Sequence, residues 1–149
     1  MARQNEEKFL FWALRGHRHA VAFCQSIFKI SQVWDDLIDR DRAVSDAQIN
    51  EAFWTALVSI PQNPFYAAHM IHLTPLLSQY IIDWIDATRF EGEGRHGETI
   101  AFVLRDSVGS IVIQCAYLLG GFEWMNQVSR AVREHIFEDT LEEYREGLK

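Results

Sequence analysis

The stretch HRHAVAFCQSIFKISQVWDDLIDR, residues 17–40, decides the fold class because its apolar side chains recur at helical spacing. One face is apolar at every third or fourth position, as expected for the core side of a helix, and consists of Phe23, Ile27, Ile30, Trp34 and Leu37. The opposite face starts apolar and becomes acidic, through Val21, Cys24, Phe28 and Gln32 to Asp35 and Asp39. This second face fits either a cavity with a mouth for a charged head group or a helix that emerges into water.

The rest of the chain shows helical periodicity and lacks the alternation and hairpin turns of a β-protein. Ser45 has the spacing of a capping box, Thr74-Pro75 predicts a helix start, and Gly120-Gly121 predicts a stop. The three glycines of residues 91–97 predict a mobile connection. We expect an all-α, single-domain helical bundle of about six or seven helices over residues 1–149. The expected helices are 4–14, 17–40, 46–59, 64–73, 75–90, 98–119 and 122–146.

The composition is that of a folded, soluble protein, since 48% of the 149 residues are hydrophobic. The formal net charge of -7 argues against a nucleic-acid partner, which usually requires a surplus of Lys and Arg. We expect no membrane span, because no apolar run reaches the roughly 18 residues required, and a cytoplasmic location. Cys24 and Cys115 have no CxxC partner and are expected to be reduced and buried.

Two aspartate clusters carry the main functional signal, WDDLID at residues 34–39 and DWID at residues 83–86. At about 100° per residue, Asp35, Asp36 and Asp39 share one strip of a helix surface. Carboxylate oxygens suit Mg²⁺, so facing clusters on two helices predict a metal site if they converge. The alternative is that both clusters are solvated helix faces, where Asp36 and Arg40 form an ordinary surface pair.

Asp106 precedes a helix that is apolar nearly all round, so its charge needs a partner. That partner is a metal, a substrate cation, a backbone N–H or an arginine from a neighbouring helix, the last two being more common. His69 and His72 are spaced i,i+3 but are not accompanied by a zinc motif. An apolar stripe on the final helix predicts a cover for the core and leaves a homodimer seam open. Its members are Phe137, Leu141, Tyr144 and Leu148.

Residues 30–39, ISQVWDDLID, resemble the first aspartate-rich helix of the class I isoprenoid synthases, which holds Mg²⁺ against a prenyl diphosphate. The resemblance implies Mg²⁺ as cofactor and places Phe28 and Cys24 beside a pocket for the substrate chain. It also implies two sets of metal ligands, Asp35, Asp36 and Asp39 in the first motif and, by residue type only, Asp83 and Asp86 in the second. The chain departs from the family in its short length and in having Arg40 and Arg42 split by Asp41.

Two classes of function remain open from the sequence, and the sequence does not decide whether the chain is an enzyme. The first is Mg²⁺-dependent binding or processing of a small diphosphate-bearing substrate, with Arg40, Arg42 or Arg89 completing the phosphate clamp. An all-α nucleotide pyrophosphatase-like enzyme is a variant of this class. The second is a non-catalytic, small helical accessory protein of the phage type, whose aspartates keep its surface soluble.

Overall fold

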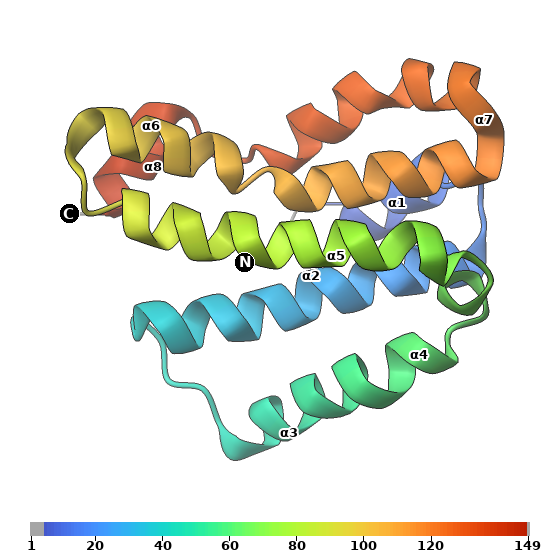
Figure 1. Ribbon diagram of the computed structural model, residues 1–149, viewed down its shortest axis with the longest axis horizontal. Coiled ribbons are helices and arrows are strands. Elements are labelled where there is room, and N and C mark those ends of the chain that lie inside the picture. The colour runs from blue at the N-terminus through green and yellow to red at the C-terminus, as the bar shows by residue number, and fades with distance from the viewer. Residues whose placement is uncertain (1–4, 149) are drawn as a thin grey trace. The chain divides into compact units, whose positions relative to one another are not determined.

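The computed structural model describes residues 5–148, which form helices and connecting turns without a strand (Figure 1). The chain is 85% helical, which confirms the expected all-α helical bundle. It divides into two compact units, Met1–Met70 and Ile71–Lys149. The expectation of a single domain stays a prediction.

The first unit contains α1 (Glu6–Ala13), α2 (Arg18–Asp39), α3 (Asp46–Trp54), the π-helical turn η1 (Thr55–Ser59) and α4 (Ile60–Gln62). The capping box predicted at Ser45 is present: its hydroxyl accepts from the Gln48 backbone N–H at 3.2 Å, and the Gln48 side chain accepts from the Ser45 N–H at 2.9 Å. The wide turn η1 ends two residues before Pro61, which has no N–H to donate to the helix.

The helix predicted over residues 17–40 is α2, which differs from the prediction by one residue at each end. On its predicted core face Phe23 is fully buried, whereas Leu37 is 44% exposed, so this face reaches solvent near the C-terminal end. On the opposite face Val21, Cys24 and Phe28 are at most 9% exposed. A hollow wide enough for a substrate chain would leave its lining accessible to water, so this half of α2 belongs to the core.

The second unit begins within α5 (Pro64–Phe90) and continues through α6 (Gly94–Leu104), α7 (Ser107–Ile136) and α8 (Leu141–Gly147). The helix start predicted at Thr74-Pro75 is wrong, because Pro75 lies inside α5. The deviation from helical geometry in α5 occurs at His69 instead, with φ −123° and ψ 18°. Within residues 5–148 the structure has five helices rather than the expected six or seven. This number takes the run from α3 through η1 to α4 as one helix and Gly94–Gly147, which contains α6, α7 and α8, as one helical stretch.

The connection predicted over residues 91–97 is shorter than expected, since α6 already begins at Gly94. Gly97 is buried within α6, and a Cβ atom there would lie 2.4 Å from the Phe90 carbonyl oxygen. This glycine therefore allows the end of α5 to approach α6 closely, which is a packing role rather than one of flexibility. Composition alone does not distinguish these two uses of glycine.

The helix stop predicted at Gly120-Gly121 corresponds to a sharp break inside α7. Gly121 has φ 78° and ψ −174°, so the chain reverses there and forms an outgoing arm (residues 107–120) and a return arm (residues 122–136) (Figure 1). The return arm buries Val128, Val132 and Ile136, which recur every four residues on one face. Its packing thus depends on an apolar stripe that the reversal turns inward.

One helical stretch, Gly94–Gly147, contains an 18-residue window with a mean hydropathy of 1.4, long and apolar enough to cross a membrane. Of that window 44% is buried within the protein, and the core helix of a soluble protein passes the same test. The stretch is weak evidence for a membrane span, so the expectation of none stays a prediction.

Gly121→Ala is expected to lower the free energy of unfolding by roughly 1–2 kcal/mol, because a side chain at positive φ is strained. The matched control is Gly147→Ala, since a Cβ atom at either position meets nothing within 4 Å and only Gly121 has a positive φ. Urea denaturation measures both values. Equal stability of the two variants contradicts the assigned backbone conformation.

Candidate functional site

The first aspartate cluster occupies the C-terminal end of α2, in the first unit. Asp35 and Asp36 are half-buried and Asp39 is exposed. The Gln32 amide donates to one oxygen of Asp36 at 3.1 Å, which orients that carboxylate along the helix. The last turn of α2 contains no basic residue, and Arg40, the residue after its last turn, adopts a left-handed conformation with φ 57°. The carboxylates thus crowd the negative end of the helix dipole.

The second aspartate cluster lies on α5 in the second unit, and its members are held by neighbouring side chains. The Asp83 carboxylate accepts from the Gln79 amide and from the Ser107 hydroxyl, both at 2.7 Å. Asp86 pairs with the exposed Arg89 at 3.4 Å. Asp83 therefore connects α5 to the start of α7 by hydrogen bonds.

Among residues 5–148, no three His, Cys, Asp or Glu side chains form a group that could hold a metal ion. The two aspartate clusters belong to different units, and their convergence on one site stays a prediction. His69 packs against Phe65 with ring centroids 4.9 Å apart, and His72 lies 2.8 Å from the Gln114 side-chain oxygen. Both cysteines are buried, as the sequence predicted.

A polar cluster that the sequence did not indicate surrounds the junction between α6 and α7. Arg105 at this junction donates to Glu91 at 2.7 Å, and each of the two side chains is only 16% exposed. The Tyr144 hydroxyl of α8 donates to the same Glu91 carboxylate. The Arg105 guanidinium also lies 4.3 Å from the centre of the Trp84 ring on α5, a cation–π contact. One arginine thus connects α5, α6 and, through Glu91, α8.

The charges of this cluster stabilise one another. Burial lowers the pKa of Arg105, but the hydrogen bond and charge of Glu91, with a contribution from Tyr144, raise it above the ordinary value. Burial and the Glu91 carboxylate raise the pKa of Tyr144 well above its ordinary value, although Arg105 offsets part of this effect. Tyr144 consequently remains a protonated donor over the physiological pH range, and Arg105 remains charged.

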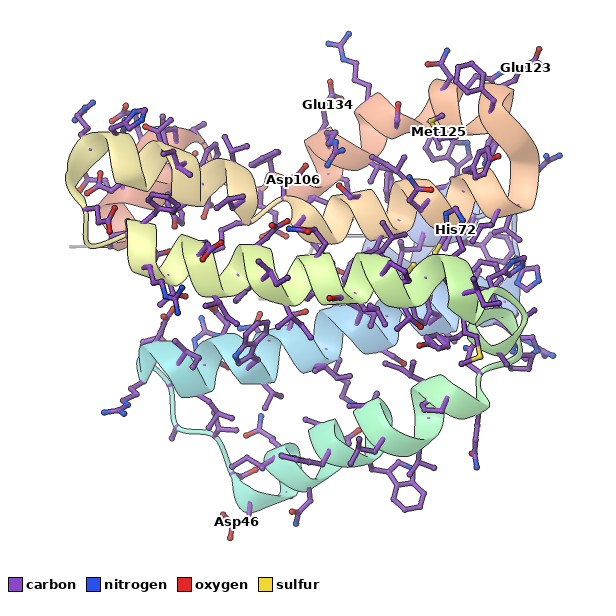
Figure 2. All side chains as sticks on the ribbon, viewed as in Figure 1. Asp46, His72, Asp106, Glu123, Met125 and Glu134 are labelled. Atoms are coloured by element: carbon purple, nitrogen blue, oxygen red, sulfur yellow. The ribbon has the colours of Figure 1, made fainter. Side chains whose placement is uncertain are left out.

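Asp106, the second residue of the junction, is 7% exposed and forms an ion pair with Arg133 of the return arm. The partner is therefore an arginine, one of the two more common alternatives that the sequence suggested. Arg133 also donates to the Ser110 hydroxyl at 3.3 Å. Burial raises the pKa of Asp106, and the attraction of Arg133 offsets only part of that rise. Figure 2 shows Asp106 at the junction of α6 and α7.

The last helix, α8, is fastened to α6 mainly by Arg145, whose side chain is 10% exposed. Its guanidinium donates to the Thr99 hydroxyl at 2.7 Å and lies 3.3 Å from the Glu98 carboxylate. The rings of Phe137 and Tyr144 pack against Phe102 with centroids 4.9 and 5.4 Å apart. The predicted stripe is only partly confirmed: Phe137 and Tyr144 pack inside the unit, but Phe137 lies between α7 and α8 and Leu148 is 37% exposed. The homodimer seam stays a prediction.

Comparison of the chain with protein-family models, with curated proteins and with solved structures gave no match. The resemblance of residues 30–39 to the isoprenoid synthases consequently stays a prediction. The geometry distinguishes two kinds of acidic group: carboxylates paired with arginines at the α6–α7 junction, and a crowded, water-accessible group at the end of α2.

Glu91→Gln is expected to lower the free energy of unfolding by about 1–3 kcal/mol, because it removes the carboxylate charge that pairs with the mostly buried guanidinium of Arg105. The matched control is Glu134→Gln, which removes the exposed partner of Arg130 and should change stability by less than about 0.5 kcal/mol. Urea denaturation at pH 7 compares them. An equal loss in both variants rejects the structural role of the junction pair.

Asp106→Asn is expected to alter the pH dependence of stability. Because the folded state raises the pKa of Asp106 above 3.8, it binds a proton more tightly than the unfolded state, and wild-type stability falls as pH rises through the raised pKa. The asparagine variant lacks this effect. The free energy of unfolding of the variant should therefore exceed that of wild type by the largest amount near pH 7. This difference should shrink as the pH falls toward about 4. Urea denaturation across this range tests the sign, and an advantage that grows on acidification contradicts it.

Proposed function

We propose that the C-terminal end of α2 binds Mg²⁺ together with a small diphosphate-bearing ligand. The observation that carries this proposal is the placement of Asp35, Asp36 and Asp39 within the last turn and a half of a 22-residue helix, none of them buried. The negative end of a helix dipole disfavours additional negative charge, so a bound cation stabilises this arrangement. The proposal is for binding and includes no chemical step.

The donor set fits magnesium better than a softer metal. All three side chains offer hard carboxylate oxygens, which suit Mg²⁺ better than a soft metal. Within the described residues they do not by themselves form a group of three that could hold a metal ion, so the ligand has to supply part of the coordination shell. Mg²⁺ commonly takes only one or two protein carboxylates and fills its octahedral shell with water and phosphate oxygens. A ligand that brings its own diphosphate therefore does not need a closed protein cage.

Exposed positive charge follows directly after the carboxylates. Arg40 and Arg42 lie in the connection between α2 and α3, both exposed. Arginine presents planar donors that match phosphate oxygens, so these two side chains are suited to meet the parts of a diphosphate that the metal does not neutralise. Phe28 is buried in the core and is not assigned a contact with the ligand. Participation of Asp83, Asp86 and Arg89 from the second unit stays a separate prediction.

Isothermal titration calorimetry with Mg²⁺ and inorganic diphosphate tests the proposal. Wild-type protein should bind diphosphate only when Mg²⁺ is present, and the double variant Asp35→Asn with Asp39→Asn should bind at least roughly tenfold more weakly, since it removes two anionic ligands. Thermal melts provide a second measurement, because a ligand that binds only the folded state raises the midpoint.

The matched control is Asp46→Asn, which changes an exposed aspartate at the start of α3 rather than on α2 (Figure 2). It should bind Mg²⁺ and diphosphate as wild type does. Absence of binding to the wild-type protein rejects the proposal, as does equal binding by the double variant. Either result favours a helical accessory protein with aspartates that serve only solubility.

A further inference from the structure

The return arm of α7 is joined to the outgoing arm by a single residue with unusual backbone geometry. Gly121 has φ 78° and ψ −174°, and a Cβ atom there would meet nothing within 4 Å. The preceding Gly120 is tightly packed by comparison, since its Cβ position lies 2.6 Å from the Trp124 side chain. Gly121 thus combines a backbone conformation that other residues rarely adopt with open space beside its Cα atom, two features expected of a hinge.

The far end of the return arm is held at the start of the outgoing arm. Arg133 forms the ion pair with Asp106 and donates to Ser110, while Ile136 packs over Gly109. A Cβ atom on Gly109 would lie 2.9 Å from the Asp106 Oδ1 atom and 3.4 Å from Ile136, so only glycine permits this approach. Hinge and attachment thus lie at opposite ends of the arm.

When the return arm lies against the outgoing arm, one oxygen of the buried Asp106 carboxylate lacks a hydrogen-bond donor among residues 5–148. Within the described residues the buried Asp106 Oδ1 atom accepts no hydrogen bond, and Arg133 engages the other oxygen. Arg133 is 44% exposed, so its own charge remains partly in water. Opening of the arm would hydrate the carboxylate, whereas closure buries Val128, Val132 and Ile136. The free-energy difference between the closed and open states therefore depends on two opposing contributions. Apolar burial favours the closed state, and hydration of the Asp106 carboxylate favours the open state.

We propose that the return arm opens as a unit about Gly121, and that Arg133 keeps it closed by compensating the charge of the buried Asp106 carboxylate. Apolar burial makes the closed state dominant, so opening is a minor local event of the native protein. The open state uncovers the corner formed by Asp106, Gly109 and Ser110. The ion pair is then a latch, because its loss leaves a buried charge that favours opening.

Hydrogen exchange of the full chain, read out by mass spectrometry, tests the latch. In Arg133→Gln the amides of residues 122–136 should exchange roughly tenfold faster than in wild type, while those of residues 107–119 should keep their wild-type rates. The matched control is Arg130→Gln, the same substitution on the same arm at a 90% exposed side chain paired with Glu134, and it should change exchange by less than about twofold.

The double variant Arg133→Gln with Asp106→Asn separates a latch from general destabilisation. Removal of the buried charge should return exchange of residues 122–136 toward the wild-type rate, which a merely structural loss at Arg133 would not do. Faster exchange of both arms in Arg133→Gln overturns the hinge, because it indicates global unfolding. Exchange equal to that of Arg130→Gln, or no rescue in the double variant, overturns the latch.

Discussion

A charged side chain that leaves water needs an opposite charge, and the second unit is organised around this requirement at the α6–α7 junction. Helical structure is interrupted at Arg105 and Asp106, which point their charges to different partners. Arg105 binds Glu91 at the end of α5, and Asp106 binds Arg133 on the return arm. Two adjacent residues of opposite charge thus fix elements that are far apart in sequence.

Local signals explain which parts of the fold could be predicted. The ends of α2 follow from hydrophobic periodicity, the start of α3 from the capping box at Ser45, and the reversal in α7 from two adjacent glycines. The helices predicted over 98–119 and 122–146 are wrong in being continuous, since the structure interrupts them at residues 105–106 and 137–140, where no proline or glycine marks a break. Two further errors concern residues that have different structural roles in different contexts. Pro75 is accommodated inside α5, and Gly97 is required for a close helix contact rather than for a loop.

Of the two groups of charged residues, only the aspartate cluster on α2 could be predicted from the sequence, because its members are close in sequence and lie on one helix. The cluster of Asp35, Asp36 and Asp39 follows directly from spacing on α2. The junction cluster joins Arg105 to a residue 14 positions earlier and Glu91 to a residue 53 positions later, separations that no periodic pattern encodes. The need of Asp106 for a partner was readable from its apolar surroundings, but Arg133 became identifiable only through the reversal at Gly121.

Asp106 is buried and the aspartates at the end of α2 are not, so the free-energy cost of binding a cation differs between the two places. A metal at Asp106 would have to displace Arg133 and enter a buried corner, so binding would include the cost of opening the return arm. At the end of α2 the carboxylates are already accessible to water, and binding would relieve repulsion that the helix dipole increases. Burial therefore makes Asp106 a structural charge, whereas cation binding at the site proposed on α2 would require no such opening.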